Sequence, residues 1–516
     1  MLFNTYIFIF FFLPLALVGF HCLGRQGHHR AAIMWLVGMS LFFYSWWNPA
    51  YLALLIFSII FNYSAGKLLA RAFESKQKSK PMLVFGVMCN LVLLGYYKYA
   101  DFFIENINDL IGSGLILHEV ILPLAISFFT FQQIAYLVDA YKGESKEHNF
   151  LDYCLFVTFF PQLIAGPIVH HKEMLPQFSK MAIFRIRSDD FAVGLTIFIL
   201  GIFKKVILAD GISVFASPVF DAAESGVTLT FFEAWGGSIA YTLQLYFDFS
   251  GYSDMAIGLA RMFGIYLPIN FNSPYKATSI IEFWRRWHMT LSRFLRDYLY
   301  IALGGNRNGT INRYINLMIT MILGGFWHGA GWTFIVWGTL HGLYLVINHL
   351  WRTIVPNPGN NFIYTILSWT LTFLAVVVSW VSFRADSIFA ARSIIESMVG
   401  LNGISLSPRF ANILEDSSFI VRSLPINFDG MFYNGLADWS SGWLIIIATL
   451  VLVAPNVQQI VAKYDNLKYR DEMERGFCWP NIEWSDSSKH ALVMALLSIM
   501  AVFAMAAPSE FLYFRF

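Results

Sequence analysis

Long apolar runs separated by short polar loops recur along nearly all of the chain. A helix needs about 20 mostly apolar residues to cross a bilayer. Such runs lie at residues 4–23, 31–47, 50–70, 82–101, 116–138, 150–169, 191–209, 228–247, 314–327, 331–350, 363–383, 442–461 and 490–507. Several are short or contain glycine and proline, so the pattern predicts about 11–13 transmembrane or re-entrant helices. The expected fold class is all-α, and the expected protein is a polytopic membrane protein.

Two of the runs contain breaks. Pro123 lies inside the run at 116–138, and Pro161, Gly166 and Pro167 lie inside the run at 150–169. Irregular backbone at membrane depth is tolerated only where protein or a water-filled cavity surrounds it. We therefore expect broken or re-entrant helices at these two places.

The loops differ in charge. Basic residues follow the first and third runs, whereas acidic residues follow the fourth. Because cytoplasmic loops carry an excess of lysine and arginine, the loops at 25–30 and 71–80 are predicted to be cytoplasmic and the N-terminus extracytoplasmic. The stretch 384–440 is the longest insertion without a span and is expected to be a surface loop with short helices. We expect one membrane domain over 1–516.

Composition agrees with this pattern. Of the 516 residues, 57% are hydrophobic, 18% aromatic and only 13% charged, whereas a soluble domain carries about 25% charged residues. The chain lacks the charge needed to cover a water-facing surface of its size. Its net charge of +2 disfavours a nucleic-acid binder, which would show a strongly basic face. The scattered cysteines form no CxxC pair, which disfavours a zinc ribbon.

A polar cluster follows the run at 228–247. Asp248, Tyr252 and Ser253 stand among apolar residues, where unsatisfied polar groups are costly. They are candidates for contact with a substrate. The alternative is a helix end at the membrane interface, with Ser253 or Asp254 capping the next helix. Both interpretations remain open at this point.

Residues 282–298 carry an apolar stripe with basic residues beside it. The stripe consists of Trp284, Trp287, Leu291, Leu295 and Tyr298, a spacing that predicts an amphipathic helix along the membrane interface. On such a helix Arg285 and Arg296 share one direction, where they could face lipid phosphates or the phosphates of a nucleotide-bearing donor. His288 lies within one residue of the stripe, so it can point into the protein.

His328 lies between two apolar runs with glycines on both sides, in the stretch GGFWHGAGW from Gly324. A hydrogen-bonded packing histidine is the usual interpretation of such a residue. Here, however, the glycines are expected to open space beside the imidazole. Histidine titrates near neutral pH and suits a general base. His341 is a secondary candidate, and a metal site is disfavoured because carboxylates at ligand spacing are absent.

Two histidines on separate elements, beside a broken-helix cavity and a basic face, favour group transfer inside the membrane. His328 would take the proton from an attacking hydroxyl, and His288 would position or polarise the acyl group. The chain has no GxSxG elbow, so a serine acyl-enzyme is disfavoured. The rival classes are a transporter, which would show internal repeats, and a non-catalytic scaffold of a polysaccharide export complex.

Five long stretches resemble the membrane-bound O-acyltransferase family, and the match is closest to its bacterial branch that acetylates alginate. They are SFFTFQQIAYLVDAYKGE from Ser127, FPQLIAGPIVH from Phe160, LYFDFSGYSDMAIGLARMFG from Leu245, EFWRRWHMTLSRFLRDYLYIALGGNR from Glu282 and GGFWHGAGWTFIVWGTLHG from Gly324. With the N-terminal runs they cover nearly all of 1–390, and 120–350 matches best.

This resemblance implies a multi-helix fold with a funnel and tunnel through the inner membrane, with His328 as the characteristic family histidine and His288 as its partner. It implies acetyl-CoA as cytoplasmic donor without a tightly bound cofactor. The acceptor would be an extracytoplasmic polysaccharide, reached through a separate periplasmic acetyltransferase. Alginate is the favoured acceptor, and peptidoglycan and cellulose are the alternatives.

Overall fold

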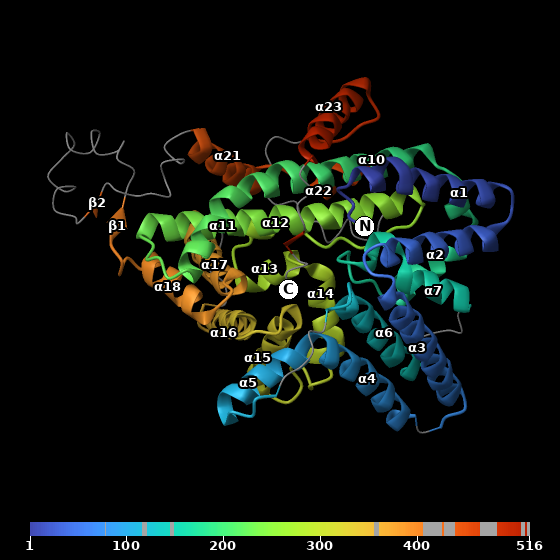
Figure 1. Ribbon diagram of the computed structural model, residues 1–516, viewed down its shortest axis with the longest axis horizontal. Helices are drawn as coiled ribbons and strands as arrows, with labels where there is room; N and C mark the ends of the chain where they lie inside the picture. Colours follow the sequence, from blue (N-terminus) through green and yellow to red (C-terminus); the bar gives the residue numbers. More distant parts are fainter. Residues whose placement is uncertain are drawn as a thin grey trace.

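The computed structural model describes residues 1–77, 79–115, 121–144, 149–355, 361–405, 426–427, 439–464, 482–506 and 511–512. Over these ranges the chain is almost entirely helical (Figure 1). The exception is one parallel pair of two-residue strands, β1 (Ile404–Ser405) and β2 (Ile426–Asn427). The predicted all-α class is confirmed. The assignment of a single domain stays a prediction.

The N-terminal half begins with helices that match the predicted runs closely. They are η1 (Phe8–Phe12), α1 (Leu13–Arg25), α2 (His29–Ser45), α3 (Ala50–Glu74), α4 (Lys80–Leu94), η2 (Gly95–Tyr99), α5 (Ala100–Ile111), α6 (Ile126–Tyr141), α7 (Phe150–Thr158), α8 (Phe160–Leu163), α9 (His171–Phe178) and η3 (Met181–Phe184). The run at 150–169 is broken as predicted, because α7 stops before Pro161 and residues 164–170 are not helical.

The central part contains the longest helices. They are α10 (Ser188–Phe203), η4 (Lys204–Ala209), α11 (Asp210–Glu224), α12 (Phe231–Met262), η5 (Pro274–Lys276), α13 (Ile280–Arg286), α14 (Met289–Phe294), η6 (Leu295–Tyr300), α15 (Thr310–His328), α16 (Trp332–Ile354), α17 (Phe362–Arg384) and α18 (Ile388–Met398). The C-terminal part adds α21 (Trp439–Val453), α22 (Val457–Val461), η7 (Ala462–Tyr464) and α23 (Ser488–Ala504).

Five helical segments of the described chain are long and apolar enough to cross a membrane: Phe8–Arg25, Ala50–Glu74, Lys80–Ile111, Ser188–Glu224 and Phe362–Arg384. A sixth is obtained if Gly442–Val453 and Val457–Tyr464, bent by 51°, form one span. The remaining predicted runs are also helical, but they are shorter, interrupted or, like α12 with 32 residues and α16 with 23, long without being apolar enough. The side of the membrane on which the N-terminus lies stays a prediction.

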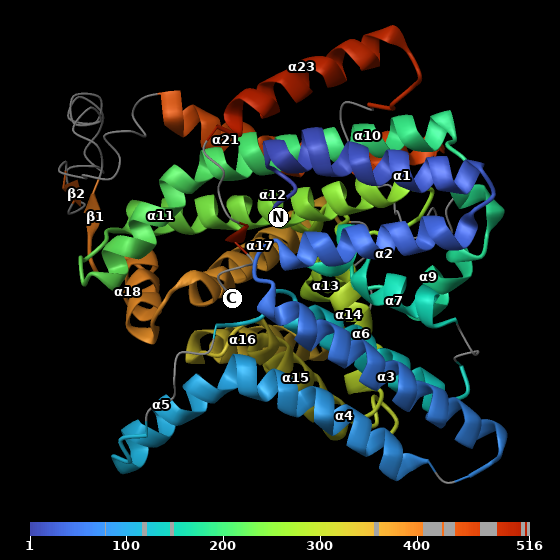
Figure 2. The ribbon, with the colours of Figure 1, turned by 45° about the vertical axis from the view of Figure 1, so that its right-hand side comes forward.

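The helices fall into two groups. One group contains α1, α12 and the continuous segment α10–η4–α11, which runs along α12, while α3, α4, α6, α15 and α16 belong to the other (Figure 2). In both views α13 and α14 lie between these groups. Two buried apolar clusters, which together draw on nearly all of these helices, form the core. The elements that carry the predicted site therefore lie in the interior.

Glycine pairs set the distance between α10 and α12. A Cβ on Gly258 would lie 2.5 Å from the backbone oxygen of Gly194, and one on Gly251 would lie 2.9 Å from that of Gly201. Side chains at these positions would push the helices apart. Small residues allow such close contact between helices in membranes.

Two local predictions are wrong. The helix expected at 228–247 continues to Met262, so Asp248 to Asp254 lie inside α12 and neither Ser253 nor Asp254 caps a helix. The amphipathic helix expected at 282–298 is three short helices, because Trp287 is extended and His288 is left-handed, with φ of 42°. Periodicity alone could not detect this break, since no glycine or proline marks it.

Candidate active site

His288 occupies the break between α13 and α14. Its backbone has a positive φ, an uncommon conformation for a residue with a side chain, often found at functional sites. Two backbone hydrogen bonds fix the segment on either side: the Asn272 N–H donates to the Arg286 oxygen, and the Met289 N–H donates to the Asn270 oxygen, each at 2.9 Å. The break turns the imidazole inward, where it is completely buried.

The hydrogen bonds of Asn270 define the tautomer of His288. The Asn270 Oδ1 atom accepts from the Thr290 hydroxyl at 2.8 Å, and its amide nitrogen donates to Ser253 Oγ at 3.1 Å. His288 Nδ1 lies 3.1 Å from the same Oδ1 and must therefore donate to it. In a neutral imidazole the other nitrogen then carries the lone pair. This nitrogen, Nε2, is buried and has no hydrogen-bond partner among the described residues.

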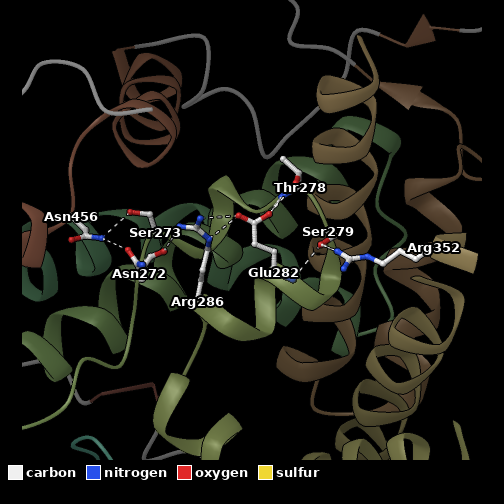
Figure 3. A network of polar contacts seen from close by, with 8 residues as sticks. All are labelled: Asn272, Ser273, Thr278, Ser279, Glu282, Arg286, Arg352 and Asn456. Atoms are coloured by element: carbon white, nitrogen blue, oxygen red, sulfur yellow. Dashed lines mark hydrogen bonds and ion pairs between the residues drawn. The ribbon is translucent and has the colours of Figure 1, made fainter. Parts of the chain in front are cut away.

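A wider polar network holds the segment that carries Asn270 (Figure 3). Arg286, two residues before His288, contacts Glu282 Oε1 at 2.8 Å and donates to the Asn272 oxygen at 3.3 Å. Asn456, at the start of α22, donates to Asn272 Oδ1 and to Ser273 Oγ at 3.0 and 3.1 Å. Side chains far apart in the sequence thus fix the loop that orients His288.

His328 is the last residue of α15, and its position is fixed through the backbone. The final carbonyl groups of a helix lack intrahelical partners. Here the Lys98 ammonium donates to the oxygens of Trp327 and His328 at 2.7 and 2.9 Å, and the Tyr99 hydroxyl donates to that of Phe326 at 3.1 Å. A cation at this end of a helix is also favoured by the helix dipole.

The two imidazoles lie beside one another in an aromatic enclosure. The ring centroids of His288 and His328 are 6.4 Å apart. Phe249 packs edge-on against His288 at 4.7 Å, and Trp337 and Phe383 both lie 5.2 Å from His328. Both imidazoles are buried among these aromatic rings, and an imidazole is able to exchange a proton with a reactant.

The glycines around His328 do not open space, contrary to prediction. A Cβ on Gly325 would lie 2.3 Å from the Phe334 oxygen, and one on Gly329 would lie 2.1 Å from the Phe334 ring. They allow α15 to pack closely against α16. The expected space beside His328 is therefore absent, and the role of His328 stays a prediction.

His341 does not join this pair. The Trp284 indole N–H donates to its Nδ1 at 3.2 Å, so Nε2 carries the proton of the neutral ring. Nε2 lies 2.9 Å from Ser379 Oγ, whose own proton is donated to the Val376 oxygen. Both nitrogens are occupied, which is the arrangement of a packing histidine.

The polar cluster of α12 has two different roles. Asp248 forms a buried ion pair with Lys205 at 2.6 Å and accepts from the Leu512 N–H at 3.1 Å. Tyr252 stacks on the Phe3 ring at 5.0 Å. These contacts place neither residue beside the imidazoles. Ser253 alone reaches the site, indirectly, through Asn270.

The two arginines expected to meet phosphates are exposed. Arg296 binds the adjacent Asp297, with contacts of 2.7 and 3.2 Å. The break at His288 removes the single helix on which Arg285 and Arg296 were to share a direction. Their predicted role in binding a donor stays a prediction.

Sequence reasoning missed the residues that position the histidines, which are Asn270, Thr290, Lys98 and Tyr99. Lys98 could have been found, because a lysine inside the apolar run at 82–101 is costly without a dedicated partner. Asn270 carried no such signal, since its importance follows from a contact with a residue 18 positions away.

Helices of membrane-spanning length around a buried pair of histidines define a membrane protein with a candidate site in its interior. The family model for membrane-bound O-acyltransferases matches residues 41–382. This chain belongs to that family and is therefore a multi-pass membrane acyltransferase.

Individual relatives carry related activities. The peptidoglycan O-acetyltransferase of Helicobacter pylori is 48% identical over 437 residues, covering 79% of this chain and 81% of the relative. A probable alginate O-acetylase of Pseudomonas aeruginosa is 41% identical over 444 residues, covering 84% and 82%. The teichoic acid D-alanyltransferase of Bacillus subtilis is 29% identical over 269 residues, covering 50% and 67%.

Proposed function

We propose that the protein moves acetyl groups from cytoplasmic acetyl-CoA toward the hydroxyl groups of an extracytoplasmic glycan. The observation that carries this proposal is the buried His288, whose Nδ1–H is committed to Asn270 while Nε2 has no partner among the described residues. A buried basic nitrogen without a partner is costly unless a ligand completes it. A hydroxyl group is the donor that such a nitrogen would accept.

The reaction balances as one displacement. His288 Nε2 accepts the proton of the acceptor hydroxyl while the hydroxyl oxygen forms a C–O bond with the thioester carbonyl carbon. The C–S bond then breaks, and the leaving thiolate takes up the proton from the imidazolium. The contacts support His288 as the base and His328, 6.4 Å away between ring centroids, as the group that positions the acyl carbonyl. This exchanges the two roles predicted from the sequence.

Two acceptors have support. Alginate is the acceptor favoured by the sequence motifs, and relatives named for alginate are 41% identical to this chain. Peptidoglycan is supported by the relative named for it, at 48% identity. Both polymers lie outside the cytoplasm, so we propose that the protein resides in the inner membrane with its N-terminus outside, and that a periplasmic acetyltransferase delivers the acetyl group.

The test of transfer uses purified protein in detergent with acetyl-CoA radiolabelled in the acetyl group and an added hydroxyl acceptor, either the glycan or a partner acetyltransferase. Label should leave CoA with the wild type and not with a variant carrying both His288→Ala and His328→Ala. Arg392→Ala, which alters an exposed residue of α18, is the matched control and should behave as wild type. Equal release by the double variant would contradict the proposal.

The acceptor is tested in cells that lack the gene and are complemented with wild type or the double variant. Acetate esters are measured separately on peptidoglycan and on secreted polysaccharide. Restoration on one polymer identifies the acceptor. Restoration on membrane lipid alone would contradict the glycan assignment.

A further inference from the structure

A basic cavity lies at the start of α10, apart from the two histidines. It has a volume of about 170 Å³. Its charged lining consists of four basic side chains and one carboxylate, namely Lys180, Arg185, Arg187, Arg261 and Asp190. An excess of like charge around one enclosed space is unfavourable unless an anion neutralises it.

The inner wall of this cavity is rigid. The buried Arg261 donates to the Tyr464 oxygen at 2.6 Å, and its guanidinium lies 5.5 Å from the centre of the Tyr266 ring. Gln177 donates to the Tyr266 oxygen at 3.0 Å and accepts from the Tyr266 N–H at 2.9 Å. The cationic wall is thus held in place by neighbouring groups.

The single carboxylate is already engaged. Asp190 accepts from the Tyr266 hydroxyl at 2.8 Å and lies 3.4 Å from both Arg261 Nε and Arg187 Nε. Lys180 and Arg185 form no ion pair with the described residues and are exposed at the mouth. Their positive charges are therefore left for a ligand.

A second cavity continues this basic surface. It shares Arg185 with the first and is also lined by His21, Arg25 and His29, without a carboxylate. Arg25 belongs to the loop whose charge predicts a cytoplasmic location. Both cavities therefore lie on the side of the membrane from which a nucleotide-bearing donor would arrive, and where anionic lipid headgroups also meet basic pockets.

The cavity and the loop that positions His288 both contact α12. Arg261 lies eight positions after Ser253, the residue that holds Asn270 behind His288. At 1.5 Å per residue this separation is about 12 Å along the helix. A phosphate bound beside Arg261 would therefore lie about 12 Å along α12 from Ser253.

We propose that the cavity formed by Lys180, Arg185, Arg187 and Arg261 binds a phosphate group. Guanidinium groups bind phosphate oxygens through paired, charge-assisted hydrogen bonds, and a lysine adds a further positive charge. The phosphate could belong to the CoA moiety of the donor or to an anionic lipid headgroup. The CoA source rests on the proposed function, whereas the phosphate site itself does not.

The experiment measures binding rather than transfer. Purified protein carrying both Lys180→Ala and Arg185→Ala is compared with wild type for the Kd of radiolabelled CoA. Retention of phosphatidylglycerol from mixed vesicles is measured by native mass spectrometry. Loss of two charged contacts should weaken binding of the true ligand at least about tenfold. Arg185→Lys, which keeps the charge, should lose less affinity than the double variant, and Arg392→Ala should bind as tightly as wild type.

The two arms separate the sources. Weaker CoA binding with unchanged lipid retention assigns the phosphate to the donor, and the reverse assigns it to a lipid. If neither ligand responds to the double variant, or if wild type binds neither, the phosphate site is refuted. If wild type does not bind CoA, and the double variant retains less phosphatidylglycerol than wild type, the proposed donor is wrong while the phosphate site stands. Both substitutions are at exposed positions, so a monodisperse sample with unchanged Tm shows that the variant is folded.

Discussion

The two histidines of the active site are held in different ways. His288 is fixed through its ring, because Asn270 accepts from Nδ1 and so decides which nitrogen is basic. His328 is fixed through its backbone, because Lys98 donates to its carbonyl oxygen at the end of α15. The first device selects a protonation state, and the second selects a position. The contact of His288 with Asn270 is the observation on which the proposed role of His288 as base rests.

The largest effect is expected from removing either imidazole. His288→Ala and His328→Ala should each lower the rate of transfer by about 10²- to 10⁴-fold, the usual contribution of a general acid–base group. Radiolabel transfer by each variant is then measured with added imidazole. The added imidazole should restore part of the rate of His288→Ala, because a free imidazole molecule can replace the missing side chain as a base. Recovery restricted to His328→Ala would return the base to His328.

The next effect tests the tautomer. Asn270→Ala removes the acceptor of the His288 Nδ1–H bond, a loss of about 1–2 kcal/mol or roughly tenfold in kcat. The KM for acetyl-CoA should stay unchanged, since Asn270 is not placed against the donor. Ser253→Ala removes only the partner of the Asn270 amide nitrogen. It is the control, and its kcat should fall less than that of Asn270→Ala. A rise in KM with constant kcat would contradict the role in tautomer selection.

A smaller effect on transfer, with a clear effect on stability, is expected at Lys98. Lys98→Met leaves the carbonyl oxygens of Trp327 and His328 without this donor and should destabilise the fold by about 1–3 kcal/mol. Tyr99→Phe removes one neutral hydrogen bond, to Phe326, and should cost about 1 kcal/mol. The Tm measured by thermal unfolding in detergent should fall more for Lys98→Met than for Tyr99→Phe. Equal Tm values for wild type and Lys98→Met would show that the stability of α15 does not depend on the hydrogen bonds from Lys98 to its last carbonyl groups.

The smallest effect on transfer is expected at His341. Its two nitrogens are bonded to Trp284 and Ser379, so His341→Gln should lower Tm through lost hydrogen bonds of about 1 kcal/mol each. Transfer per folded molecule, measured on the monodisperse fraction, should remain close to wild type. A loss as large as that of His288→Ala would make His341 a third member of the site.

Much of the fold was predictable because the bilayer imposes a simple rule on sequence. Apolar runs must become helices when no water can satisfy the backbone, and each predicted run corresponds to a helix or a broken helix within the described ranges. The error at 282–298 arose because periodicity extends across His288, whereas tertiary hydrogen bonds from the Asn270–Asn272 segment break the helix there.

The sequence determined by itself that this is a helical membrane protein with two chemically notable histidines. Hydrophobic length and rare polar residues in apolar runs are local properties, which a single chain displays directly. Only the tertiary structure decided that His288 Nδ1 donates to Asn270, and that His341 and Asp248 are occupied by other partners. Those outcomes depend on contacts between residues far apart in the chain, because a hydrogen bond is short and directional and is formed only when folding brings its two groups together.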